Sequence, residues 1–126
     1  MDLETVSFSL ISSTAAVDMK TASAKTALFT VPTGLHLVVT AIVVRSLSAT
    51  LAGGTSYSFG DSATGTGWAS AIDLHLMTNT NSNDTEVIYP SAKFYMSAAG
   101  AVFGMYITTG ASNAATATID LFGYLY

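Results

Sequence analysis

The sequence has no cysteine and few charged residues. Without cysteine, the chain forms no disulfide bond, no thiolate metal site and no cysteine nucleophile. Charged residues make up 10% of the 126 residues, against about 25% in typical soluble domains. The four Lys and Arg residues, in a chain of net charge −4, are too few to neutralise a phosphate backbone. We therefore expect no nucleic-acid partner.

A long hydrophobic run is also lacking. The longest apolar run, residues 35–44, is about half the length of a membrane-spanning helix and is rich in β-branched residues. This run predicts a buried strand, and we expect no membrane partner. The first four residues, MDLE, are acidic, whereas a secretory signal begins with positive charge before an apolar stretch. This start predicts synthesis in the cytoplasm.

Alternation of apolar and polar residues is the dominant pattern, and a period of two is typical of half-buried strands. Strands are predicted at residues 5–10, 27–31, 35–46, 56–59, 86–89, 93–97, 102–109 and 115–126. Residues 68–77 fit either a strand or a helical stripe. Turn residues separate the segments, notably at 32–34, 53–54 and 60–67. About eight short strands predict one all-β domain over residues 1–126, a sandwich or a barrel.

Two segments depart from this pattern. Residues 12–25 are rich in Ser, Thr and Ala, and the composition leaves a crossing loop, a short helix or an extended arm open. Gly104 lies inside the strand predicted at 102–109, which indicates a bulge or a close approach of another backbone segment.

The last predicted strand places aromatic residues on one face. If Ala117, Ile119, Leu121 and Leu125 face the core, the other face carries Phe122, Tyr124 and Tyr126. An exposed apolar patch of this kind marks a contact with another chain, so these three aromatic residues are the candidate subunit or capsid contact. Two alternatives remain open: both faces are buried within one sandwich, or the aromatic rings cover the end of a barrel.

The low charge supports the same interpretation. A monomer of 13.0 kDa exposes about 6,300 Å² by the area scaling law. Four basic and eight acidic residues place roughly one charge on every 500 Å², where average composition gives about one on every 200 Å². Such a surface has little charge repulsion to keep copies of the chain apart.

No residue pattern predicts catalysis, a cofactor or a metal. His36 lies in an apolar strand, where a partly buried residue with a satisfied ring nitrogen is the simplest interpretation. Asp73 and His75 could orient a ligand or a base, but no nucleophile motif such as G-x-S-x-G accompanies them. We therefore expect that the chain is not an enzyme.

Two weaker binding patterns complete the candidates. A loop rich in oxygen ligands resembles a calcium loop but lacks the glycine at the sixth position, and its ligand candidates are Asn79, Asn81, Asn83, Asp84 and Glu86. Four aromatic residues could form a platform that stacks on sugars, although core packing explains them more simply; these are Tyr57, Trp68, Tyr89 and Tyr95.

Three segments resemble a known group of proteins. Residues 27–34 (ALFTVPTG) and 37–45 (LVVTAIVVR) are similar to the opening of small β-sandwich proteins in the virions of tailed bacteriophages. Residues 117–125 (ATIDLFGYL) are similar to their closing strand. The resemblance covers about a quarter of the chain and implies a jelly-roll-like sandwich, often trimeric, that decorates capsids or forms parts of fibres.

The resemblance and the surface together lead to one expected function. We expect a capsid decoration, or cement, protein on the virion surface that binds the major capsid protein by non-covalent contacts, as a homotrimer and without catalysis. The N-terminal residues or residues 12–25 could reach over a neighbouring subunit. The alternative is a tail-fibre or receptor-binding module that recognises host surface glycans.

Overall fold

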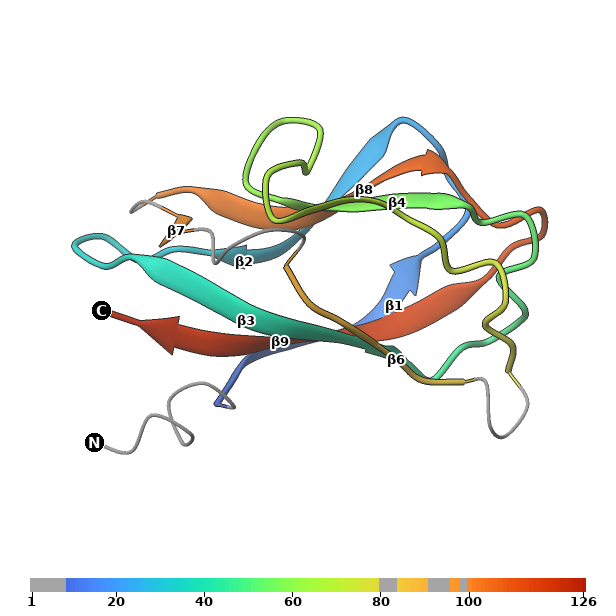
Figure 1. Ribbon diagram of the computed structural model, residues 1–126, viewed down its shortest axis with the longest axis horizontal. Coiled ribbons are helices and arrows are strands. Elements are labelled where there is room, and N and C mark those ends of the chain that lie inside the picture. Colours follow the sequence, from blue (N-terminus) through green and yellow to red (C-terminus); the bar gives the residue numbers. More distant parts are fainter. Residues whose placement is uncertain (1–8, 80–83, 91–95, 98–99) are drawn as a thin grey trace.

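The computed structural model describes residues 9–79, 84–90, 96–97 and 100–126. It consists of β-strands that form two antiparallel sheets packed face to face (Figure 1). Nine strands are assigned: β1 (Leu10–Asp18), β2 (Ala24–Thr30), β3 (Leu37–Arg45), β4 (Ser56–Gly60), β5 (Ala69–Ile72), β6 (Glu86–Ile88), β7 (Met96–Ser97), β8 (Val102–Thr109) and β9 (Thr116–Leu125). The expectation of an all-β sandwich is confirmed.

The order of the strands identifies the sandwich as a jelly roll. One sheet has the order β1-β9-β3-β6, with the two-residue strand β7 also beside β3, and the other has the order β2-β8-β4-β5. Apart from β7, the first strand pairs with the last, the second with the next to last, β3 with β6 and β4 with β5. A long hairpin whose successive pairs alternate between two sheets is the jelly-roll arrangement.

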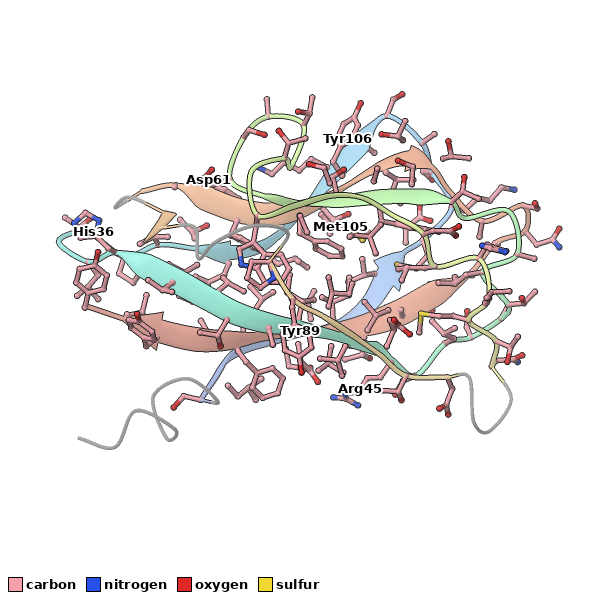
Figure 2. The ribbon with its side chains drawn as sticks, viewed as in Figure 1. His36, Arg45, Asp61, Tyr89, Met105 and Tyr106 are labelled. Carbon is pink, nitrogen blue, oxygen red and sulfur yellow. The ribbon has the colours of Figure 1, made fainter. Side chains whose placement is uncertain are left out.

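The hydrophobic core fills the space between the two sheets. Alternate residues of β3 and β9 enter it from one side, and aromatic and aliphatic residues of β4 and β8 enter it from the other. Figure 2 shows Met105 between the sheets, while Tyr106 and Arg45 project from the two opposite outer surfaces. The chain exposes 6302 Å², close to the area of about 6,300 Å² expected for a compact monomer of this mass.

Trp68 is the largest fully buried side chain, and it connects the two layers. Its ring packs edge-on against Phe59 and Phe103, with centroid distances of 6.5 and 6.2 Å. Its Nε1 donates a hydrogen bond of 2.7 Å to the carbonyl oxygen of Val39 in the facing sheet. The acceptor lies beside the register shift between Val39 and Ala41, where β3 departs from regular pairing with β9. The indole thus stabilises an irregular point of the opposite sheet.

Several predicted strands are found where the alternation placed them. The strand at 102–109 is β8, and the strand at 115–126 is β9 with slightly narrower bounds. Both features expected at Gly104, a close approach of another backbone segment and a bulge, are present. A Cβ at Gly104 would lie 2.5 Å from the carbonyl oxygen of Thr26, and the pairing of β2 with β8 shifts register beside it.

The expectation for residues 12–25 needs correction. This segment holds most of β1, a turn and the start of β2, and no described residue in it is helical. A bulge hides the strand in the sequence: register shifts between Thr14 and Val17, where Ala16 has a φ of 54°. The bulge breaks the period of two, and small polar residues leave little hydrophobic signal.

Other expectations are partly tested. Residues 68–77 contain β5 followed by turns rather than a helix. Residues 1–8 and 91–95 lie outside the described part of the chain. Residues 5–8 of the strand predicted at 5–10 and residues 93–95 of the strand predicted at 93–97 therefore lie outside it too. The first described strand begins at Leu10, and β7 covers only Met96–Ser97.

Candidate interaction surface

Strand β9 separates its residues between the core and the exterior, much as its alternation predicts. Ala117, Ile119 and Leu121 are buried in the core. The predicted contact residues Phe122 and Tyr124 are partly exposed. They lie on the opposite side of β9 and contribute nothing to the core cluster.

The apolar surface extends over neighbouring strands. Phe122 pairs with Leu10 of β1 on one side and with Ala41 of β3 on the other, so these residues form a row across the sheet. Beyond Ala41, buried Ile88 of β6 is followed by Tyr89, which is exposed. A further row joins Tyr124 to Val38, and another joins Val43 to Val87. We call the surface formed by Leu10, Val87, Tyr89, Phe122, Tyr124 and Tyr126 the outer face of the β1-β9-β3-β6 sheet.

This outer face holds most of the exposed large hydrophobic residues in the described part of the chain. Four of the five lie on it: Leu10 (56% exposed), Val87 (45%), Tyr89 (63%) and Tyr126 (54%). The fifth, Leu76, belongs to the segment after β5 and lines a cleft with Asp73 and His75. Large apolar residues are therefore concentrated on a single surface, which is how protein-contact surfaces differ from scattered exposure.

A small aromatic cluster closes one end of the outer face. The ring of Tyr126 lies 6.3 Å from that of Tyr124 and 5.3 Å from that of His36. Two backbone hydrogen bonds between His36 and Tyr126, of 2.8 and 3.1 Å, hold the end of β9 beside the start of β3. His36 Nδ1 is buried with no hydrogen-bond partner among the described residues, contrary to the satisfied nitrogen expected for it.

The other end of the outer face carries one compensated ion pair. Arg45 Nε donates to Asp120 Oδ2 over 2.7 Å, and the Ser13 hydroxyl donates to Asp120 Oδ1 over 2.5 Å. Burial alone would raise the pKa of Asp120, but the hydrogen bonds from Arg45 and Ser13 outweigh it and hold this pKa below its usual value. The pair itself carries no net charge, and Asp18 of β1, which pairs with Thr116 on the same side of the sheet, adds one negative charge at this end.

The outer surface of the second sheet is different because a loop covers part of it. Residues 61–68 fold back over β8, and a Cβ at Gly65 would lie 2.9 Å from the Cβ of Tyr106. Lys25 fastens this loop: its Nζ donates to the carbonyl oxygens of Ser62 and Val102 over 2.8 and 2.9 Å. Among the residues that the structure describes, the β1-β9-β3-β6 sheet thus presents the broad apolar surface.

The Asp73–His75 pair lies beside a cleft of about 360 Å³. His75 Nδ1 and Asp73 Oδ1 are 2.5 Å apart, and both side chains are about half exposed. Hydrogen bonds from the backbone and the ring of His75 lower the pKa of Asp73. One lining residue, Thr85, carries a hydroxyl, and it donates to Asp84. The cleft thus contains an oriented imidazole, but its described residues assemble no nucleophile–base pair.

The proposed sugar-stacking platform is wrong for two of its four residues. Trp68 and Tyr57 are buried in the core. The Tyr57 hydroxyl donates to the carbonyl oxygen of Met19 over 2.7 Å, and burial raises the pKa of Tyr57 to about 12. Tyr89 is exposed, and Tyr95 lies outside the described residues.

The calcium-loop pattern is only partly covered by the structure. Residues 80–83, which include Asn81 and Asn83, lie outside the described part of the chain. Within the described part, no group of three or more His, Asp or Glu residues is arranged to hold a metal ion. That same part contains no helix that is long and apolar enough to cross a membrane.

The prediction from sequence missed three members of the outer face, namely Leu10, Val87 and Tyr89. Each belongs to a different segment from β9, and only the strand order brings the segments together. The alternation of exposed Val87, buried Ile88 and exposed Tyr89 was a usable signal, because it assigns Val87 and Tyr89 to one face. Comparison of the chain with protein-family models, with curated proteins and with solved structures finds no match.

Proposed function

We propose that this chain is a structural protein of a virus particle, a capsid decoration protein of the tailed-phage type that works by binding other protein chains. The observation that carries the proposal is the outer face of the β1-β9-β3-β6 sheet. Its exposed leucine, valine and tyrosines are the residues that protein contacts cover, and tyrosine is enriched at the energetic centres of such contacts.

Two further features support this role. Jelly rolls are a common architecture of viral capsid and lectin domains, although this support is an analogy between folds. The low charge density favours close packing of neighbouring chains, because few charges need to lose water at a contact. The resemblance of residues 27–45 and 117–125 to phage virion proteins agrees with both.

The mechanism needs no chemical turnover. Contact with the major capsid protein removes apolar side chains from water, which contributes roughly 25 cal/mol for each Å² buried. A decoration protein that spans two capsid subunits therefore opposes their separation. In this role the chain is made in the host cytoplasm and functions on the capsid surface.

Co-sedimentation with capsids tests the proposal. Purified chain is mixed with expanded capsids of the encoding virus that lack it, and bound protein is quantified after centrifugation. We expect saturable binding at a fixed ratio to the major capsid protein and a higher temperature of capsid rupture. Absence of binding to expanded capsids would refute the decoration role.

A glycan-binding module is the second candidate, and the exposed tyrosine rings favour it. Tyr89 and Tyr126 offer faces on which sugars can stack. A glycan array separates the two candidates, with Tyr89→Ala as the informative variant. Trp68→Ala is unsuitable, because loss of a core residue would abolish binding through unfolding.

A further inference from the structure

We infer that the outer face of the β1-β9-β3-β6 sheet binds a second copy of this chain, in a two-fold symmetric dimer. The inference rests on the proposed role of this face as a protein contact and goes further by naming the partner and the symmetry. It differs from the trimer that the resemblance to phage virion proteins implies.

The charge of the outer face favours a second copy as the partner. The six residues that form the face are uncharged, and the charged residues on the same side of the sheet, which include Arg45, Asp120 and Asp18, lie toward the start of β9. Arg45 compensates the buried carboxylate of Asp120 at a distance of 2.7 Å, and Asp18 accepts hydrogen bonds from backbone N–H groups of the turn that follows β1. Two copies that meet through the six residues bring uncharged side chains together, although each chain carries a net charge of −4.

The size of the apolar surface fits a dimer contact. An aromatic side chain carries about 150–250 Å² of surface, so the exposed parts of Tyr89 and Tyr126 offer roughly 200–300 Å². Leu10, Val87 and the edges of Phe122 and Tyr124 extend this area. The total approaches half of the roughly 800 Å² that each partner contributes to a standard interface, as expected for an apolar centre within a polar rim.

The number of apolar patches decides the symmetry. A ring of three subunits needs two different complementary patches on each chain, whereas a two-fold dimer needs one patch that complements itself. The described residues present one broad apolar patch, with Leu76 as an isolated apolar residue elsewhere. A sheet surface whose centre is the row Leu10, Phe122 and Ala41 can pack against its own copy as two sheets of a sandwich do.

Two matched substitutions test the inference. Leu10→Glu adds a charge to the outer face, and Leu76→Glu makes the same change at another exposed leucine, which is not one of the six residues of that face. Molecular mass is measured by sedimentation equilibrium over a range of protein concentrations, and circular dichroism verifies that each variant is folded. Tyr89→Glu repeats the test at a second position on the face, outside the assigned strands.

For the unaltered chain we expect twice the chain mass of 13.0 kDa. Leu10→Glu and Tyr89→Glu should each raise the dissociation constant of the dimer at least about tenfold, since two-fold symmetry places the added charge on both sides of the contact. Leu76→Glu should leave the dissociation constant unchanged. A monomer, a mass three times that of the chain, or a dimer insensitive to both face variants would overturn the inference.

The capsid experiment separates this inference from the proposed function. A chain that is monomeric but sediments with capsids would refute the dimer and leave the decoration role standing. A dimer that is broken by Leu10→Glu but does not sediment with capsids would refute the decoration role and leave the dimer standing. If both hold, the outer face joins the two copies, and the dimer binds the capsid through other surfaces, at two-fold positions of the shell.

Discussion

Substitution of Trp68 tests the central packing of the sandwich. Trp68→Ala removes a fully buried ring that contacts Phe59 and Phe103. Loss of a buried Trp or Phe side chain costs about 3–5 kcal/mol. Trp68→Phe keeps most of the packing but deletes the hydrogen-bond donor to the Val39 carbonyl oxygen, which costs about 1 kcal/mol. Because the smaller ring buries less apolar surface, the substitution costs roughly 1 kcal/mol more.

These costs are large fractions of the total stability, which is about 5–15 kcal/mol for a typical domain. Equilibrium unfolding in urea, followed by circular dichroism at one fixed protein concentration, measures them. The fixed concentration matters because a dimer gains apparent stability with concentration. Leu76→Ala is the control, since an exposed residue outside both the core and the outer face should change stability by no more than about 0.5 kcal/mol.

Fluorescence provides an independent measurement, because Trp68 is the only tryptophan in the chain. A buried indole emits at shorter wavelength than a solvated one, so unfolding should shift the emission to the red. A loss of less than about 1 kcal/mol for Trp68→Ala would contradict the reasoning. Emission typical of solvated indole in the folded protein would contradict it too.

Three further predictions concern hydrogen bonds and backbone contacts. Asp120→Asn should lower stability at pH 7. The pKa of Asp120 is lower in the folded state than in the unfolded state. The contribution of its carboxylate to the free energy of unfolding is therefore present above the unfolded-state pKa of about 3.9 and is lost as the pH falls through the folded-state pKa. Urea unfolding at pH 7 and at pH 3 should show that the effect of the substitution is smaller in acid. Gly104→Ala should cost about 1–3 kcal/mol, seen as a lower thermal midpoint, because its Cβ would lie 2.5 Å from the Thr26 carbonyl oxygen; an unchanged midpoint would argue against this close approach. Tyr57→Phe should cost only about 1 kcal/mol in urea unfolding, because the Met19 carbonyl oxygen also accepts a backbone hydrogen bond; a cost above roughly 3 kcal/mol would contradict this.

The sequence predicted the strands that alternate cleanly and missed the one that does not. Strands β8 and β9 combine alternation with β-branched residues, and both were located within a residue or two. Strand β1 was not recognised, since its bulge at Ala16 interrupts the alternation. Strand order was beyond reach, because it depends on pairs such as β1 with β9 that are remote along the chain.

The same limit applies to the candidate contact surface. The outward side of Phe122 and Tyr124 followed from the period of two in a single strand. That Leu10 and Tyr89 extend the same surface depends on which strands lie beside β9, which no local pattern encodes. The burial of Trp68 agrees with the core packing favoured for it, but its contacts with Phe59, Phe103 and Val39 depend on the packing of the two sheets, which no local pattern encodes.

The position of β9 has a consequence for biosynthesis. This strand comes at the end of the sequence, yet it lies between β1 and β3 and completes the ladder of both. A nascent chain on the ribosome must therefore keep the apolar strand β3 unpaired on that side until β9 emerges. The β1-β9-β3-β6 sheet should be completed only after that point, and chaperones that shield hydrophobic segments should raise the yield of the protein during overexpression.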